Sequence, residues 1–335
     1  MGEFISHNVW MRDIPDNILL TSLSIPGTHN SCSIGGILGF TKTQDLDLPE
    51  QLEAGVRFLD IRLSHYRDNL FVHHDVVHMG KCHADVLVAC SNFLKLYPSE
   101  TIFLSVKEED RLDSGLGRFA PSRIFGKSRG DSMSWVVRSD SFEEAFRART
   151  WEHVEDPSLF YNLASPLPGH DLVSTNLTPK TTLGDVRGKI ILLRRFEAGQ
   201  DLGFDLTYWL ENMRFRSVTS LAYAVEDHWR NPGEDDKYKF IITHIEEAMS
   251  RNPRDLYITF CNAVTLNAHG YAKTINPRLN DYLAGSPRGR VGIIALDYFE
   301  EPRELVSNVI DMNFAPEVTA GHDEGQAPAG DDVER

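Results

Sequence analysis

Short apolar runs alternate with polar or helix-like stretches along most of this chain. Eight runs have the length and the apolar content of buried strands, and they cover residues 22–25, 56–63, 70–73, 101–107, 189–195, 217–225, 256–260 and 291–297. Apolar residues spaced three and four apart, followed by Gly or Pro, predict helices over 48–55, 84–98 and 239–253. Such alternation is typical of a parallel sheet covered on both faces, and about eight strands in one domain favour a closed barrel. We therefore expect an α/β fold, a distorted and irregular TIM (β/α)8 barrel with few helices after its second and third strands.

Two segments depart from this alternation. Residues 110–180 are rich in Ser, Gly, Arg and Pro, which indicates a long excursion on one rim of the barrel, with a short helix at 141–149. Residues 315–335 are acidic and poor in large apolar side chains, so we expect a disordered tail. The predicted organisation is a single barrel over residues 1–314 followed by this tail.

Composition and charge narrow the classes of partner. The chain has 335 residues, of which 41% are hydrophobic and 25% charged, enough to bury a substantial core. Its formal net charge of -15 disfavours nucleic acid and broad attachment to anionic lipid, because both require a basic surface. No run approaches the ~20 apolar residues that span a bilayer, and no signal-peptide pattern begins the chain, so we expect a soluble protein. The four cysteines have no metal or scaffold spacing and leave secreted and cytoplasmic locations open.

Polar and titratable side chains lie at or near the ends of six predicted strands. They are His29 in PGTHN, Asp60 and Arg62, His73 and His74, Lys107, Arg194 and Arg195, and Asp297 with Tyr298. The carboxyl ends of barrel strands form the face on which barrel enzymes hold their active sites. Two histidines across a pocket can serve as general base and general acid, and the cationic side chains can grip a phosphate. This set predicts phosphodiester cleavage in which a neighbouring hydroxyl attacks phosphorus to form a cyclic phosphate, with no metal required.

These motifs resemble the bacterial, single-domain type of phosphatidylinositol-specific phospholipase C. The resemblance runs through WMRDIPDNILLTSLSIPGTHNS, GVRFLDIRL, FVHHD, YPSETIFLSVKEE, RGKIILLRRF and RVGIIALDY, and it omits only residues 110–180 and the tail. It implies a distorted TIM barrel in which the inositol 2-hydroxyl attacks phosphorus. Diacylglycerol leaves, and inositol 1,2-cyclic phosphate is then hydrolysed to inositol 1-phosphate. The implied partner is phosphatidylinositol in a membrane, contacted transiently by a monomer without an obligate protein partner.

Carried over by motif, the resemblance implies a role for each reacting side chain. His29 would be the general base, with its ring held by Asp297, and His74 would be the general acid. Arg62 would bind the phosphate and stabilise the charge of the transition state. Asp60 would orient Arg62.

Further residues are implied to bind the headgroup. Lys107 and Arg195 would hold inositol hydroxyls, and Asp227 in AVEDHW would do the same. Trp229 would stack on the inositol ring, at a position where the family usually has Tyr. Trp209 in TYWLEN resembles a rim aromatic near the lipid, although a half-buried packing role suits it equally well.

Membrane contact is expected to depend on apolar side chains. Because the surface is acidic, docking would rely on rim residues around Ile37, Leu38 and Phe40 that insert into the interface. Whether glycosylated phosphatidylinositol anchors are also cleaved is left open by the sequence.

One position departs from the family pattern. The bacterial enzymes have Asp after the PGTH histidine, whereas this chain has Asn30, as the calcium-dependent eukaryotic phospholipases C do. We count Asn30 among the substrate-binding residues; it can accept a hydrogen bond but cannot raise the pKa of His74 by charge. Calcium prefers several carboxylate ligands, yet Arg62 and Lys107 occupy the positions of the acidic ligands in the calcium enzymes. We therefore expect no metal and no cofactor.

Two alternatives stay open. One is a catalytically weak module that binds inositol phosphates or a lipid headgroup, and only Asn30 supports it. The other is a metal-dependent glycerophosphodiesterase, which also uses a barrel and a histidine pair but needs acidic metal ligands. Turnover of phosphatidylinositol in excess chelator distinguishes the phospholipase from both.

Overall fold

A computed structural model gives the fold, and it describes residues 7–35, 41–66, 69–74, 77–109, 141–154, 156–163, 176–263 and 268–314. Its strands are β1 (Ile25–Thr28), β2 (Phe58–Tyr66), β3 (Asn69–His74), β4 (Val77–Cys82), β5 (Ile102–Glu108), β6 (Ile190–Arg195), β7 (Phe204–Asp205), β8 (Arg214–Val218), β9 (Ala222–Glu226), β10 (Leu256–Phe260) and β11 (Ile293–Leu296). Its α-helices are α1 (Leu48–Glu53), α2 (His83–Leu96), α3 (Phe142–His153), α4 (Leu183–Val186), α5 (Glu234–Ser250), α6 (Ala268–Gly285) and α7 (Glu304–Asp311). Short 3₁₀ helices cover His7–Asp13, Leu20–Ser22 and Pro157–Leu159.

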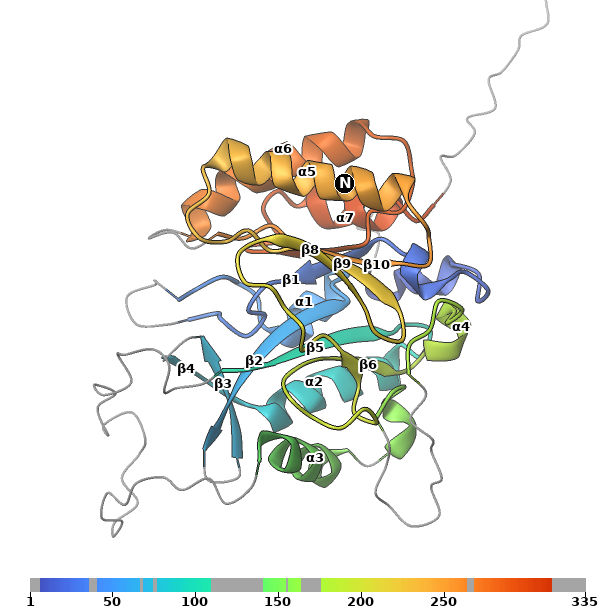
Figure 1. Ribbon diagram of the computed structural model, residues 1–335, viewed down its shortest axis with the longest axis vertical. Helices are drawn as coiled ribbons and strands as arrows, with labels where there is room; N and C mark the ends of the chain where they lie inside the picture. The colour runs from blue at the N-terminus through green and yellow to red at the C-terminus, as the bar shows by residue number, and fades with distance from the viewer. Residues whose placement is uncertain are drawn as a thin grey trace, which may run out of the picture.

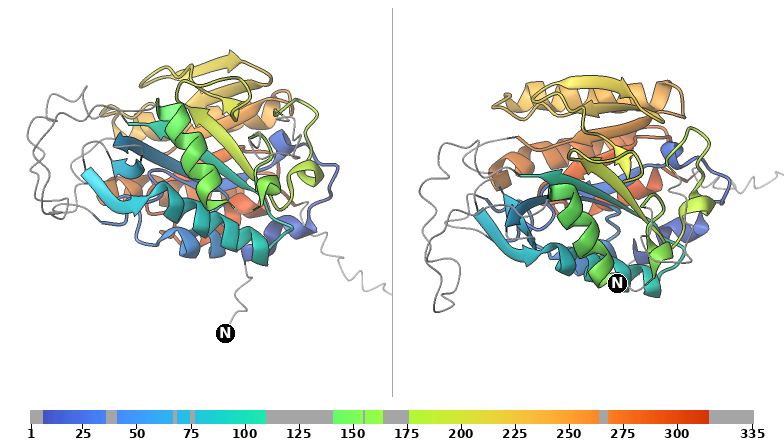
Figure 2. Two further views of the ribbon diagram at one scale, coloured as in Figure 1. Left: turned by 90° about the horizontal axis from the view of Figure 1, so that it is seen from below. Right: turned by 60° about the horizontal axis from the view of Figure 1, so that its bottom comes forward.

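The strands form one sheet in the order β7-β6-β5-β2-β1-β11-β10-β9-β8. Neighbours from β7 to β9 are parallel, whereas β8 runs antiparallel to β9. The β3–β4 hairpin extends from β2 by antiparallel pairing. The sheet curls round its own apolar interior (Figures 1 and 2), which confirms the expected α/β fold with a distorted barrel.

Helices cover the outside of the curled sheet. Figure 1 shows α5, α6 and α7 on one side and α2 and α3 on the other. Local sequence fixes where several of them begin. Asp47 caps α1 and pairs reciprocally with Glu50, and Ser141 and Glu144 form the same capping box at the start of α3.

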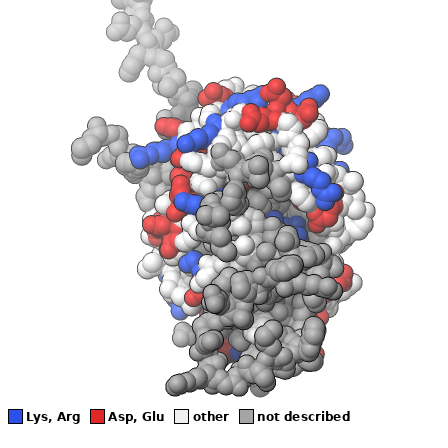
Figure 3. All heavy atoms as spheres, turned by 90° about the vertical axis from the view of Figure 1, so that its left-hand side faces the viewer, with Lys and Arg blue, Asp and Glu red and all other residues white. Residues whose placement is uncertain are grey.

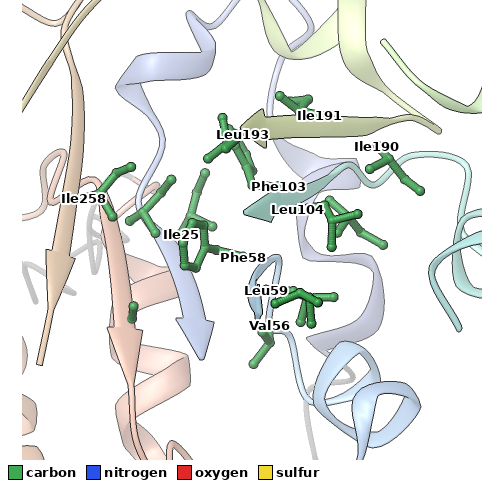
Figure 4. Close-up of a cluster of buried hydrophobic side chains, with 14 of the residues drawn as sticks. Ile25, Val56, Phe58, Leu59, Phe103, Leu104, Ile190, Ile191, Leu193 and Ile258 are labelled. Carbon is green, nitrogen blue, oxygen red and sulfur yellow. The ribbon is translucent and has the colours of Figure 1, made fainter. Parts of the chain in front are cut away.

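Aliphatic and aromatic side chains from adjacent strands fill the centre. Figure 4 shows Ile25 of β1, Phe58 of β2, Phe103 of β5, Leu193 of β6 and Ile258 of β10 gathered in one cluster, and all five are buried. Continuous apolar strands of this kind hold the backbone rigidly. The polar residues at the strand ends are therefore fixed in position relative to one another.

The barrel has an open seam. Strands β7 and β8 end the sheet order, and no strand pairing joins them in the part of the chain that the structure describes. Residues 206–213 cross from one side to the other, since Leu206 N–H donates to the Arg194 carbonyl and Asp227 N–H donates to the Met213 carbonyl. Packed aromatic rings fill this region in place of a ladder of hydrogen bonds, with Phe204 of β7 and Tyr223 of β9 at 5.9 Å between centroids.

Some boundaries differ from those predicted. The run 217–225 forms two strands, β8 and β9, because the chain reverses between Val218 and Ala222. The first strand is 25–28 rather than 22–25, and the helix expected at 141–149 extends to His153. Residues 110–140 and 164–175 of the expected excursion, and the whole expected tail, lie outside the described residues.

Candidate active site

The proposed site residues lie along the carboxyl ends of the parallel strands. His29 and Asn30 follow β1, and Asp297 follows β11. His74 instead ends β3 of the antiparallel hairpin that extends from β2. Strand register brings the cations together, because Arg62 of β2 pairs with Lys107 of β5, which pairs with Arg195 of β6. Neighbouring strands lie about 4.8 Å apart, so one row of the sheet presents three positive charges. Lys, Arg, Asp and Glu are interspersed on the described part of this face of the molecule (Figure 3).

His29 is held on both sides of its ring. Its Nδ1 lies 2.8 Å from Asp297 Oδ1, and both side chains are more than nine-tenths buried, at 8% and 6% exposed. A carboxylate can only accept, so Nδ1 carries the proton. Nε2 then carries the lone pair, which accepts a hydrogen bond from Arg62 Nη2 at 3.1 Å. This tautomer presents a base beside a guanidinium that can bind an anion.

His74 faces His29 across a short space. The ring centroids are 6.5 Å apart and the rings stand nearly perpendicular, at 81°. His74 Nδ1 lies 2.8 Å from the carbonyl oxygen of Thr41, and its Nε2 lies 3.2 Å from Asn30 Nδ2. The structure thus brings together the two histidines that the sequence nominated.

Asp60 lies behind the site and links its cations. It is fully buried, with Oδ2 3.7 Å from Arg62 Nε and Oδ1 3.4 Å from Arg195 Nη1. The backbone N–H of Asn30 also donates to it at 3.2 Å. Burial opposes ionisation, but the two guanidinium groups outweigh it and hold the pKa of Asp60 below its usual range.

Arg195 and Asp227 meet through Trp209. The guanidinium carbon of Arg195 lies 3.6 Å from the centroid of the indole ring, and the indole N–H donates to Asp227 Oδ2 at 2.8 Å. Burial raises the pKa of Asp227, and the charge of Arg195 reduces that effect. One half-buried indole therefore contacts two of the residues assigned to the inositol.

Trp209 is half-buried and makes the packing contacts that the second of its two expected roles requires. Its ring packs on Arg195 and, at 5.8 Å between centroids, on Phe260. Its neighbour Tyr208 is the exposed aromatic, at 56%. Phe40, together with Ile37 and Leu38, lies outside the described residues.

Trp229 is half-buried on the same turn as Asp227. Its backbone N–H donates to Asn212 Oδ1 at 3.0 Å, and Arg230 lies 5.0 Å from its ring centroid. Among the described residues, the Trp229 ring has no cation–π contact with Arg62, Lys107 or Arg195.

Sequence reasoning missed Glu109. Its Oε1 accepts from Arg62 Nη1 at 3.1 Å and lies 3.9 Å from Lys107 Nζ. Burial and the neighbouring Arg62 lower the pKa of Lys107, and the charge of Glu109 opposes them. The sequence could have nominated Glu109, because residues two apart on an extended strand point to the same side and Glu109 follows Lys107 by two. A second carboxylate, Glu211, lies 3.9 Å from the same ammonium.

No group of three or more His, Cys, Asp or Glu side chains among the described residues is arranged to hold a metal ion. None of the helices that the described segments form combines the length and the apolar character needed to cross a membrane.

An irregular α/β barrel with a carboxylate-held histidine, a second histidine and a guanidinium at its carboxyl edge defines an acid–base barrel enzyme. No family model matches the chain. The 1-phosphatidylinositol phosphodiesterase of Staphylococcus aureus (strain Newman) is 27% identical over 329 residues, which cover 91% of this chain and 93% of that protein. The protein of the same name from Listeria monocytogenes is 27% identical over 315 residues, covering 91% and 84%.

A solved structure agrees with these relatives. A pentafluoro-Phe incorporated phosphatidylinositol-specific phospholipase C from Staphylococcus aureus superposes with a TM-score of 0.75 at 26% identity, covering 92% of this chain and 98% of that one. The chain is a protein of the bacterial phosphatidylinositol-specific phospholipase C type, which confirms the resemblance drawn from its motifs.

Proposed function

We propose that this chain is a phospholipase C that cleaves phosphatidylinositol by metal-independent acid–base catalysis. The products are diacylglycerol and inositol 1,2-cyclic phosphate, followed by inositol 1-phosphate. The observation that carries the proposal is the placement of His29, bound to Asp297 and Arg62, opposite His74 at 6.5 Å.

In the first stage the inositol 2-hydroxyl gives its proton to Nε2 of His29 while its oxygen attacks phosphorus. The bond between phosphorus and the glycerol oxygen breaks, and His74 donates a proton to that oxygen. Asp297 stabilises the imidazolium that forms on His29. Arg62, freed from Nε2, holds a phosphate oxygen and stabilises the charge that develops on it.

In the second stage the roles of the two histidines reverse. His74, now neutral, takes a proton from water, and the water oxygen attacks the cyclic phosphate. The bond from phosphorus to the inositol 2-oxygen breaks, and His29 returns the proton to that oxygen. Both histidines end in the protonation state in which they began.

The remaining polar residues fit a polyol. Lys107, Arg195 and Asp227 supply two cations and one carboxylate for inositol hydroxyls, and Trp229 supplies a ring face. Asn30 stands where the substrate phosphate and His74 meet. Arg62 and Lys107 also supply the positive charge that a divalent ion would otherwise bring, and two cations repel such an ion.

The proposal extends to how the protein meets its substrate. We place residues 1–314 in a single catalytic barrel that acts as a soluble monomer and touches the bilayer transiently. Apolar side chains of the rim around Ile37, Leu38 and Phe40 would enter the interface, and exposed Tyr208 is a further aromatic side chain available for such contact. Vesicle binding that is insensitive to added salt is expected, and a steep fall with salt would contradict it.

The test of the activity is product analysis by phosphorus NMR. The protein is mixed with phosphatidylinositol in detergent micelles and excess EDTA, and we expect the resonance of a five-membered cyclic phosphate to appear before that of inositol 1-phosphate. Loss of activity in chelator, restored by a divalent ion, would indicate the metal-dependent glycerophosphodiesterase. Binding of the lipid without any product would indicate the headgroup-binding module.

A further inference from the structure

Both nitrogens of the His74 ring have uncharged partners. Nδ1 lies 2.8 Å from the main-chain carbonyl of Thr41, and Ser33 Oγ is 3.4 Å from the same nitrogen. Nε2 lies 3.2 Å from the amide nitrogen of Asn30. Since a carbonyl oxygen can only accept, the Thr41 contact keeps a proton on Nδ1 whether the ring is neutral or charged. The proton that His74 gains and loses is therefore the one on Nε2.

With Nδ2 directed toward Nε2, the Asn30 amide can hydrogen-bond only to the neutral His74 ring. Its N–H can donate to the lone pair of Nε2, but it would oppose an N–H at that position in the imidazolium. The other end of the amide is free, because Asn30 Oδ1 is buried and has no hydrogen-bond partner among the described residues. A half-turn about the last side-chain torsion exchanges the two ends, and that torsion has two nearly equivalent positions.

The backbone of Asn30 does not need to move for this exchange. Its N–H is bound to Asp60, and its carbonyl accepts from Ser33 N–H at 2.8 Å and from Thr43 Oγ1 at 3.1 Å. Its φ of 44° lies in the left-handed region that Asn and Asp adopt more readily than most residues. Only the amide group is left to rotate.

We propose that the Asn30 amide follows the proton of His74, donating through Nδ2 to the neutral ring and accepting through Oδ1 from the protonated ring, while Thr41 fixes the opposite nitrogen. This inference rests on the proposed function, in which His74 is the acid. An amide that serves both states favours neither of them. The general acid of this chain is then positioned by hydrogen bonds without the bias toward imidazolium that an aspartate would impose.

Other charged groups face His74 from the surrounding elements. His29 stands opposite with Asp297 and Arg62 attached to it, and Asp60 lies behind Asn30. On its own hairpin His73 packs against His78, and the segment after Thr41 carries the Lys42–Asp45 ion pair. These groups are unchanged in the two variants of residue 30 described below. A difference in the pKa of His74 between those variants therefore arises from residue 30.

Two substitutions separate the proposal from a fixed amide. Asn30→Asp is nearly isosteric and adds a negative charge beside Nε2, so it should raise the pKa of His74 by about one to three pH units. Asn30→Gly keeps the positive φ without strain and removes both ends of the amide. Because the amide stabilises neither state preferentially, Asn30→Gly should change that pKa by less than about half a pH unit.

The measurement is an NMR titration of histidine-labelled protein, with the His74 resonance assigned by its loss in His74→Gln. Nitrogen shifts of the neutral ring should show the proton on Nδ1, and a proton on Nε2 would refute the Thr41 contact. A rise of one pH unit or more in Asn30→Gly would show a fixed donor and overturn the proposal. An unchanged pKa in Asn30→Asp would show that residue 30 does not contact the ring.

Activity supplies an independent readout. If His74 is the acid, kcat falls as the pH rises above its pKa, so Asn30→Asp should extend the alkaline side of the profile by the shift seen in NMR. The titration needs no turnover. An inactive protein would therefore count against the proposed function, and the titration would still decide the role of Asn30.

Discussion

Replacing Asp297 by Asn should disable the proposed general base while leaving the barrel folded. The carboxylate lies 2.8 Å from His29 Nδ1, and burial of both side chains keeps water from replacing it. A hydrogen bond to a charged group is worth about 1.5–3 kcal/mol, which corresponds to a fall in kcat of about 10-fold to 150-fold. The larger value is expected if the new amide donates to Nδ1, because the proton then moves to Nε2 and blocks the base.

The assay measures kcat and KM separately by phosphorus NMR on phosphatidylinositol in micelles. We expect kcat to fall and KM to stay nearly constant, because Asp297 acts on His29 and not on the inositol. The matched control is Asp255→Asn, which removes another buried carboxylate, one that is paired with Arg216 at 2.6 Å and takes no part in the proposed reaction. A kcat within threefold of the unchanged protein, or an equal loss in the control, would refute the assignment of His29 as a base held by Asp297.

Three further changes test other parts of the site. Arg62→Lys keeps the charge but loses the planar fork, so kcat should fall about 10-fold to 100-fold; unchanged kinetics would mean that the phosphate binds elsewhere. Trp209→Phe keeps a ring face for Arg195 but loses the N–H bond to Asp227, so KM should rise about fivefold with a smaller change in kcat, and a pure kcat effect would argue against headgroup binding. Asp60 has a lowered pKa in the folded state, so it adds stability above its unfolded pKa of about 4, and this is lost as the pH falls through the folded value. In urea unfolding, the stability advantage over Asp60→Asn should therefore shrink below about pH 4, and an advantage independent of pH would contradict this cause.

Much of the candidate site could be predicted because it consists of strand ends. Lys107 and Arg195 each end an apolar run, and Arg62 interrupts a third run near its end. Parallel register then sets the three cations side by side. The pairing of His29 with Asp297 joins residues 268 positions apart. Periodicity alone places both at strand ends, whereas their contact follows from the strand order, in which β1 lies next to β11.

What the sequence did not reveal depends on tertiary contacts. The run 217–225 lacks Gly, Pro and Asn, and its Thr219 and Ser220 are only weak turn signals, so the reversal between β8 and β9 was not predicted. Strand β4 is polar and half-exposed, and α6 contains Pro277 within its span, which conceals both elements from pattern rules. Trp209 contacts Arg195 and Phe260, which are distant in the sequence, and no short-range signal encodes these contacts.

The open seam also leaves two sheet edges that could pair with another molecule. Strand β7 is only two residues long, which offers little backbone to an incoming strand. Strand β8 is longer, but it places Arg214 and Arg216 on two of its three exposed positions, where they pair with Glu247 and Asp255. The barrel stays open beside its own active site. The short length of β7 and the charged side chains of β8 thus protect its two edges from pairing with another copy of the chain.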